Sequence, residues 1–300
     1  MPIHNGIIER IDKSYVVENP SVIVDKPGAV KIELSGACNL QCNYCWNKFS
    51  PRKKLISEED FKYAIDQVAE MGIEEVGLLY LGESTLHPKL IDFIKYTKSK
   101  GIPYVFLTSN GLLIKDKLMK EMAHSGLDSL KWSCNHPNKE EYLKETGIDG
   151  FNILLDNMKA FYEYREENHL PIMLYASTAV YDVNNISEEI KEFVNTKLMP
   201  YIDEHYYFDL TNQGGLVKYK FEGSICNKAK DLPCPRLWNN SYISSDMKMM
   251  CCCGGFTDDF IVGDLKKNTF KEIWNGEPYK LLRQKHLDGD LSNCVCTKEK

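Results

Sequence analysis

Three cysteines stand close together in the stretch CNLQCNYC, which runs from Cys38 to Cys45. Their C-x3-C-x2-C spacing places three thiolates on one short segment, and thiolates suit zinc or iron–sulfur clusters. Structural zinc and electron-carrying four-iron clusters both take four protein ligands. Three cysteines without a neighbouring fourth therefore predict a four-iron, four-sulfur cluster that leaves one iron open to a substrate or cofactor.

The remaining cysteines are numerous, and most of them are clustered. The chain of 300 residues holds eleven cysteines, an odd number, and no secretory signal precedes them, so a disulfide framework is not expected. In a reducing cytosol, clustered thiols are typical of metal or iron–sulfur sites. The full set is Cys38, Cys42, Cys45, Cys134, Cys226, Cys234, Cys251, Cys252, Cys253, Cys294 and Cys296.

The overall composition excludes several classes of protein. A formal net charge of -6 argues against a general binder of nucleic acid or of membrane surfaces. No apolar run approaches the roughly 18 residues of a membrane span. We therefore expect a cytoplasmic protein that has neither nucleic acid nor a membrane as its partner.

The elements that must position the cysteines follow a strand-then-helix rhythm. Residues 30–34 alternate apolar and charged side chains, as in a strand that leads directly into the cysteine loop. A helix then follows Ser57, which has Asp60 three residues later in a capping-box pattern, and Gly72 can end it. Its predicted apolar face comprises Phe61, Ala64, Ile65 and Val68.

The same rhythm repeats to make about six βα units. Such units build either a doubly wound sheet or a partial TIM-like barrel, and in both the functional residues follow the carboxyl ends of the strands. The cysteine loop has that position. Further strands are expected at 76–82, 104–111, 129–134, 171–180 and 206–215, and further helices at 88–101, 114–126, 151–167 and 186–198.

Three regions divide the chain in this interpretation. Residues 1–29 form an irregular lead-in and residues 30–219 form the βα region. Residues 220–300 form a small cysteine-rich domain with one helix expected at 273–287, because helical periodicity is otherwise lost there.

The cysteine loop resembles the signature of the radical S-adenosylmethionine (SAM) enzymes. In that family, C-x3-C-x2-C follows the first strand of a partial (β/α)6 barrel, and an aromatic residue, here Tyr44, precedes the third cysteine. The resemblance implies that Cys38, Cys42 and Cys45 hold a [4Fe-4S] cluster whose open iron binds SAM. One electron from the cluster then cleaves SAM to methionine and a 5′-deoxyadenosyl radical, which takes a hydrogen atom from a C–H bond.

Further residues resemble the SAM-binding motifs of the family. In LYLGESTLHP, Gly82 and Glu83 match the Gly-Gly-Glu-Pro-like motif that binds the SAM amino group, although the flanking turn departs from it. Polar contacts to SAM would come from Ser109, Asn110 and Ser133 at the ends of the third and fourth strands, where Asn135 replaces the usual acid. The alternative is a solvated loop carboxylate at Glu83 and ordinary turn residues at the other positions.

The C-terminal region resembles the SPASM/twitch extensions that bind auxiliary iron–sulfur clusters. A cysteine, a short hairpin, a cysteine, the sequence GDL, an EIW helix and a closing cysteine pair make up the pattern. Spacing counted from Asp246 favours the middle of the three consecutive cysteines, and the closing pair is C-x-C where C-x2-C is usual. The expected ligands of one auxiliary [4Fe-4S] cluster are Cys234, Cys252, Cys294 and Cys296, and a zinc knuckle is the alternative.

Several cysteines remain beyond the expected ligands. Cys134, Cys251 and Cys253 are candidate hydrogen-atom donors to a substrate radical, because an S–H bond is weaker than most C–H bonds. The alternative for Cys134 and Cys226 is that each is a small buried apolar residue.

The resemblance leads to a hypothesis about the reaction. About 29 residues precede the first strand, so we expect no separate domain for binding a leader peptide. A SAM-dependent oxidoreductase or epimerase that acts on a carbohydrate-like small molecule is therefore favoured, with flavodoxin or ferredoxin as electron donor. One alternative is a maturase that modifies a peptide or protein. The other is a non-catalytic iron–sulfur or zinc-binding protein.

Overall fold

A nine-stranded sheet runs through the part of the protein that the computed structural model describes, residues 6–210, 233–255 and 257–292. The strand order is β6-β5-β4-β3-β2-β1-β7-β8-β9, and neighbours are parallel from β6 to β7 and antiparallel from β7 to β9. The strands are β1 (Ala29–Ile32), β2 (Glu75–Gly77), β3 (Tyr104–Ser109), β4 (Ser129–Ser133), β5 (Met173–Val180), β6 (Glu204–Asp209), β7 (Asn240–Ile243), β8 (Lys248–Met250) and β9 (Ile261–Asp264).

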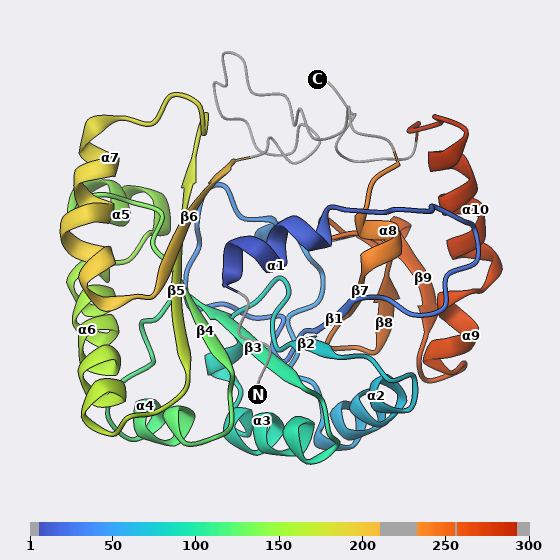
Figure 1. Ribbon diagram of the computed structural model, residues 1–300, viewed down its shortest axis with the longest axis horizontal. Coiled ribbons are helices and arrows are strands. Elements are labelled where there is room, and N and C mark those ends of the chain that lie inside the picture. The colour runs from blue at the N-terminus through green and yellow to red at the C-terminus, as the bar shows by residue number, and fades with distance from the viewer. Residues whose placement is uncertain (1–5, 211–232, 256, 293–300) are drawn as a thin grey trace.

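The first six strands are neighbours in chain order, and helices surround them on the outside (Figure 1). A doubly wound sheet reverses its strand order part-way, and this sheet does not. The predicted partial (β/α)6 barrel is therefore confirmed. The helices of this region are α2 (Glu58–Glu70), α3 (Leu90–Ser99), α4 (Asp116–Ala123), α5 (Lys139–Thr146), α6 (Phe151–Glu167) and α7 (Glu188–Phe193).

Helix α2 forms where its sequence predicts, with the Ser57 half of the predicted capping box. The hydroxyl of Ser57 accepts a hydrogen bond from the Asp60 amide at 3.1 Å and so caps one of the free amides at the start of the helix. The predicted apolar face is buried, and Gly72 follows the helix with φ +65°, a left-handed conformation that favours glycine.

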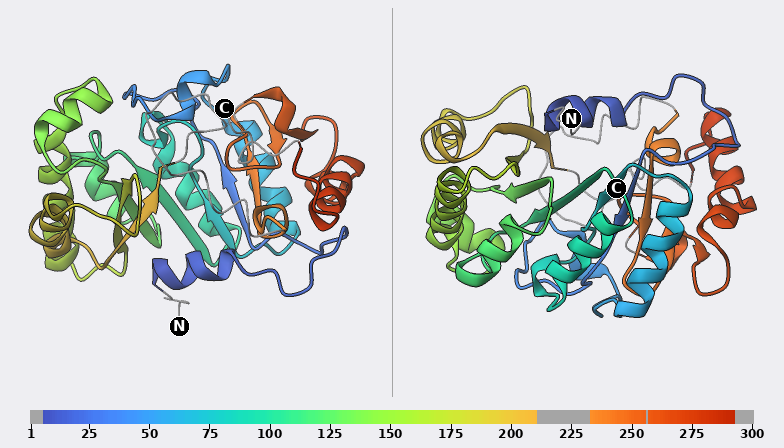
Figure 2. Two further views of the ribbon diagram at one scale, coloured as in Figure 1. Left: turned by 90° about the horizontal axis from the view of Figure 1, so that it is seen from above. Right: turned by 60° about the horizontal axis from the view of Figure 1, so that its bottom comes forward.

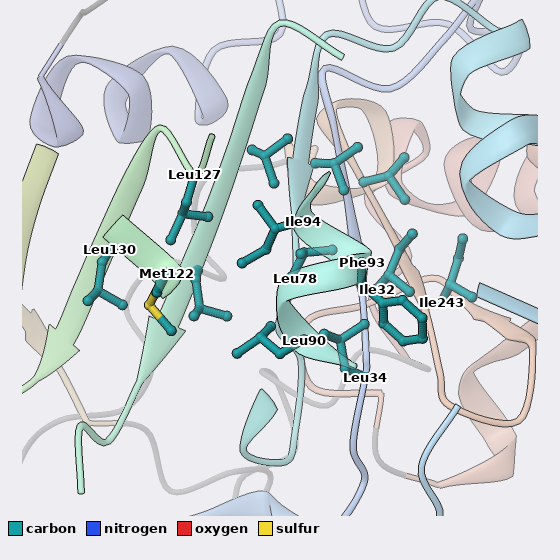
Figure 3. Packing of buried hydrophobic residues seen from close by; sticks show 14 of the residues in the cluster. Ile32, Leu34, Leu78, Leu90, Phe93, Ile94, Met122, Leu127, Leu130 and Ile243 are labelled. Carbon is teal, nitrogen blue, oxygen red and sulfur yellow. The ribbon is translucent and has the colours of Figure 1, made fainter. Parts of the chain in front are cut away.

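The core lies between the strands and the helices (Figure 3). Ile32 and Leu34 of the first strand region pack there with residues of α3 such as Phe93, and all three are fully buried or nearly so. Because side chains alternate along a strand, Lys31 and Glu33 face the other way, into the interior of the barrel.

The lead-in is not irregular throughout, so that expectation was wrong for helix α1 (Ile7–Ser14). Arg10 of α1 bonds the Glu75 carboxylate at 2.6 Å, and its guanidinium lies 3.4 Å from the centre of the Tyr104 ring. Both partners begin strands, so α1 covers the amino-terminal end of the barrel, opposite the cysteine loop (Figure 2). No residue of this short helix is buried.

The C-terminal region continues the barrel sheet. Strand β7 pairs in parallel with β1, with Ala29 opposite Asn240, and β7 and β8 form the predicted hairpin. The single helix expected at 273–287 is instead two, because Gly276 separates them. The helices here are α8 (Arg236–Asn239), α9 (Phe270–Trp274) and α10 (Glu277–Leu287).

The domain boundaries after residues 29 and 219 remain predictions. Cys226, Cys294 and Cys296 lie outside the described residues. Within the described ranges, no helix is both long and apolar enough to span a membrane.

Candidate functional site

The three clustered cysteines lie on the loop between β1 and the short 3-10 helix η1 (Trp46–Phe49), at the carboxyl end of the first strand. The loop is fixed to the end of α5 by two backbone hydrogen bonds, from the Gln41 amide to the Thr146 carbonyl (3.1 Å) and from Asn43 to Glu145 (2.9 Å). A third, from the Cys45 amide to the Cys42 carbonyl (3.0 Å), closes a tight turn between two of the cysteines.

All three thiols are free and partly exposed. Burial raises the pKa of Cys38 to about 11 and that of Cys42 to about 12, so these thiols bind a metal only by releasing protons. Structural zinc takes four protein ligands, whereas the three thiols of this loop match a [4Fe-4S] cluster that leaves one iron open.

Gly82 lies where the loop after β2 crosses the cysteine loop. A Cβ atom at this position would lie 1.9 Å from the carbonyl oxygen of Ser35 and 2.6 Å from that of Ala37. The next residue, Glu83, donates its amide hydrogen to the Ala37 carbonyl at 2.8 Å. Only glycine permits this close approach, which brings Glu83 next to the cysteine loop.

The Glu83 side chain is 3% exposed, so it is not the solvated carboxylate of the alternative interpretation. It accepts hydrogen bonds from the Thr85 amide (3.0 Å), the Thr85 hydroxyl (2.7 Å), the Ser109 hydroxyl (2.9 Å) and the Asn110 amide (2.8 Å). No lysine, arginine or histidine of the described residues forms an ion pair with it. A buried carboxylate held only by neutral donors is therefore placed to receive a cation.

Asn110 connects this carboxylate to the cysteine loop. Its side-chain amide donates to Asn39 Oδ1 at 2.7 Å and lies 3.9 Å from the Cys38 sulfur. The structure thus brings together Cys38, Glu83, Ser109 and Asn110, four of the residues that the sequence predicts for the site.

Tyr44 is held by residues that follow β4. Its hydroxyl accepts a hydrogen bond from the Asn135 amide at 3.0 Å and lies 3.2 Å from His136 Nε2. The Asn135 oxygen in turn accepts from the Ala179 amide at the end of β5 (3.0 Å). Ser133 is partly exposed on the interior face of β4, two residues before Asn135. Asn135, at the position of the family's acid, therefore has a structural role here.

The C-terminal cysteines differ in their surroundings. Cys252 is partly exposed and accepts a hydrogen bond on its sulfur from the Gly254 amide (3.3 Å), whereas Cys253 is exposed and Cys251 is buried in the core. Cys234 is partly exposed beside His286, whose Nδ1 accepts its amide hydrogen at 3.3 Å. The ligand assignments of Cys234 and Cys252 remain predictions, and those of Cys294 and Cys296 lie outside the described residues.

The turn that follows Cys252 packs on the barrel. The Tyr80 hydroxyl donates to the Cys252 carbonyl (2.9 Å) and to the Gly255 carbonyl (3.0 Å). A Cβ atom on Gly254 would lie 1.9 Å from the Trp46 indole. The sequence interpretation did not identify Trp46 or Tyr80. The signals that could have identified them are the position of Trp46 directly after Cys45 and the position of Tyr80 after β2.

Cys134 does not lie at the site. Its amide continues the strand pairing of β4 by donating to the Ser177 carbonyl at 3.0 Å. The side chain is 1% exposed and belongs to the core with Leu130 and Trp132, on the face away from the barrel interior.

Comparison with known proteins identifies the family. The sequence profile of the radical SAM superfamily matches residues 32–194, which is more than half of the chain. The chain belongs to the radical SAM superfamily. The iron–sulfur cluster-binding domain called SPASM matches residues 234–298. As a radical SAM enzyme with this second domain, the protein takes SAM, a [4Fe-4S] cluster and an auxiliary iron–sulfur cluster, as the sequence predicted.

Curated relatives match part of this radical SAM chain. The probable GTP 3′,8-cyclase of Saccharolobus solfataricus is 30% identical over 132 residues, which cover 44% of this chain and 42% of the relative. The GTP 3′,8-cyclase of Limosilactobacillus fermentum is 31% identical over 134 residues, covering 43% and 40%. The chain thus spans less than half the length of these relatives.

Solved structures share the fold over more of the chain. SuiB of Streptococcus suis bound to precursor peptide SuiA superposes with a TM-score of 0.72 at 14% identity, covering 91% of this chain and 68% of SuiB. BtrN in complex with AdoMet and 2-DOIA has a TM-score of 0.60 at 14% identity, covering 92% and 94%. These likenesses show that the radical SAM barrel and its C-terminal extension share one fold with these proteins.

Proposed function

We propose that this radical SAM enzyme takes a hydrogen atom from a C–H bond of a carbohydrate-like small molecule, leading to its epimerisation or dehydrogenation. The observation that carries the proposal is the buried carboxylate of Glu83, which neighbours the cysteine loop and has no cationic partner among the described residues. An ammonium group such as that of SAM would supply the missing positive charge.

The proposed roles follow from the geometry of the site. Cys38, Cys42 and Cys45 hold three irons of the cluster, and Glu83 accepts the SAM ammonium. When bound, the cluster and SAM together supply the radical that abstracts hydrogen. Ser109, Asn110 and Ser133 contribute polar contacts to SAM.

Tyr44 has a positioning role in this proposal. Its bonds to residues after β4 fix the cysteine loop against the rest of the barrel. The hydroxyl belongs to that network and so constrains the segment that carries Cys42 and Cys45. A rigid loop keeps the reacting groups in place and limits access of water.

The preference for a small molecule draws on BtrN, whose complex holds 2-DOIA. The structure of SuiB holds a precursor peptide. A peptide substrate is the second candidate, and flavodoxin or ferredoxin is the proposed electron donor.

The proposal is tested on anaerobically reconstituted protein. Two [4Fe-4S] clusters give about eight irons per chain, and changing Cys38, Cys42 and Cys45 together to Ala should leave about four. One equivalent of zinc with four irons would contradict an auxiliary iron–sulfur cluster held by the C-terminal cysteines.

The reaction type is resolved by turnover of candidate sugars and peptides in heavy water. Deuterium gain without a mass loss of two indicates epimerisation, and loss of two hydrogens indicates dehydrogenation. Failure of the protein to bind or cleave SAM would overturn the proposed activity as a whole.

A further inference from the structure

Two lysines point into the interior of the barrel from strands that are not neighbours, Lys31 on β1 and Lys131 on β4. On β1, the residues on either side of Lys31, Val30 and Ile32, are fully buried in the core beneath the helices. On β4, Leu130 and Trp132 flank Lys131 in the same way. Because side chains alternate between the two faces of a strand, both ammonium groups lie on the interior face.

Each ammonium group has neutral partners. Lys31 Nζ donates to Asn240 Oδ1 at 2.6 Å and lies 5.0 Å from the centre of the Tyr242 ring. Lys131 Nζ donates to the Tyr206 hydroxyl at 2.8 Å and lies 5.2 Å from the centre of the Tyr206 ring. No carboxylate of the described residues forms an ion pair with either lysine, so their direct partners are dipoles and aromatic faces.

The surrounding charges do not compensate these lysines. Burial, together with the positive charges of Arg236 and Lys131, lowers the pKa of Lys31 to about 7, although Cys253 and Glu75 oppose the shift. The Glu75 carboxylate is already bonded to Arg10 at 2.6 Å. Lys131 is therefore one of the charges that act on Lys31 across the interior of the barrel.

We propose that Lys31 and Lys131 bind an anionic group of the substrate, a carboxylate or a phosphate, inside the barrel. This inference rests on the proposed function, since it assigns a chemical class to the molecule that the radical attacks. A negative charge between the lysines would relieve their mutual repulsion. It would also offset the free-energy cost of burying their charged form.

The placement of the lysines also orients the substrate. Lys131 precedes Ser133 by two residues on β4, which corresponds to about 7 Å along a strand. The anionic group therefore lies deeper in the barrel than the polar residues at the strand ends. The rest of the molecule then extends toward the cysteine loop, where hydrogen abstraction takes place.

The competing explanation is that these cations balance the charge of the auxiliary cluster. Lys31 lies within the field of Cys253 and Arg236, so it could serve either purpose. Lys131 separates the two explanations, because it donates to Tyr206 on β6, on the other side of the barrel from β7.

The test measures anion binding to the reconstituted holoenzyme in the presence of SAM. Inorganic phosphate and succinate are titrated separately by isothermal titration calorimetry into the wild type, Lys31→Met and Lys131→Met. Lys117→Met is the matched control, since this lysine is exposed on α4 and pairs with Glu121 at 3.5 Å. We expect the wild type to bind at least one anion, each interior variant to weaken binding about 10-fold or more, and the control to match the wild type.

The choice of anion and two further variants sharpen the result. Binding of phosphate alone assigns a phosphate group, and binding of succinate alone assigns a carboxylate. Lys31→Arg and Lys131→Arg keep the positive charge and should retain anion binding. If the Arg variants bind and the Met variants do not, the loss of anion binding is assigned to the loss of charge.

Three results would overturn the inference. One is equal affinity in the wild type and in both Met variants, and another is absence of binding of either anion to the wild type. The third is unchanged anion binding together with a shifted reduction potential of the auxiliary cluster, which would assign the lysines to that cluster. SAM binding is measured on the same samples, because a wild type that fails to bind SAM contradicts the proposed function, whereas one that binds SAM but no anion contradicts only this inference.

Discussion

The Trp46 indole lies directly against Gly254, where a methyl group would meet the ring at 1.9 Å. Trp46 follows Cys45, and Gly254 follows Cys252 by two residues. The loop that carries the first cluster's cysteines and the turn that carries a predicted auxiliary ligand are therefore in van der Waals contact. Tyr80 strengthens this contact with two hydrogen bonds to the same turn.

Gly254→Ala should destabilise the protein by about 1–3 kcal/mol, because the added methyl group overpacks a filled contact. Urea unfolding measures the loss. Gly28→Ala is the matched control, since the nearest atom to a Cβ there is 3.4 Å away. If the Trp46 contact is the cause, Gly254→Ala should cost much less in a Trp46→Leu background. An equal cost in both backgrounds would assign the effect to another neighbour.

Glu83→Ala should weaken SAM binding by roughly 10- to 150-fold, because a charge-assisted hydrogen bond contributes about 1.5–3 kcal/mol. It also removes the acceptor for four hydrogen bonds, so the free energy of unfolding should fall as well. Glu83→Gln retains an acceptor without the charge, and it should restore much of the stability but not the SAM affinity. Undiminished SAM cleavage by both variants would show that the ammonium is bound elsewhere.

Among the candidate hydrogen donors, Cys253 is the accessible one, although its lowered pKa favours the thiolate and only the protonated thiol can give up a hydrogen atom. Cys253 is exposed, whereas Cys134 and Cys251 are buried in the core. If the reaction is an epimerisation, Cys253→Ala should keep its iron and its substrate-dependent SAM cleavage yet form no epimer. Cys134→Ala and Cys251→Ala should still form it. Full turnover by all three variants would remove the donor hypothesis and favour dehydrogenation.

The stability of the metal-free protein should depend on pH through His136. Burial lowers the pKa of this residue to about 4 from its ordinary value of 6.5. Between these two values the unfolded chain binds a proton that the folded protein excludes, so the free energy of unfolding falls as the pH drops from 6.5 to about 4.

The shift corresponds to a loss of up to about 3 kcal/mol. His136→Gln should reduce the difference in unfolding free energy between pH 7 and pH 4, measured with urea. The same difference in this variant and the wild type would exclude His136 as the source.

The sequence predicts the local structure and the first cluster loop well, because both depend on short-range patterns. The cap at Ser57 and the spacing of Cys38, Cys42 and Cys45 need no knowledge of distant residues. Glu83 was predictable only through its resemblance to a motif, since nothing in LGES indicates that the carboxylate is buried.

Contacts between distant segments could not be predicted in this way. Trp46 and Gly254 are separated by most of the chain, and neither belongs to a periodic pattern. The placement of Cys134 is different, because alternation along 129–134 puts it on the same face as the apolar Leu130 and Trp132. That pattern was present in the sequence, and it assigns Cys134 to the core.

The pairing of β7 with β1 has a consequence for how the protein is made. This edge of β1 stays uncovered until β7 has been synthesised, because Ala29 pairs with Asn240, 211 positions later in the chain. At a ribosomal speed of about 5–20 residues per second, the delay is roughly 10–40 s. During that time the nascent chain carries an open strand edge beside unoccupied thiols, and such edges invite pairing with other chains. We therefore expect this strand edge to need a chaperone during translation.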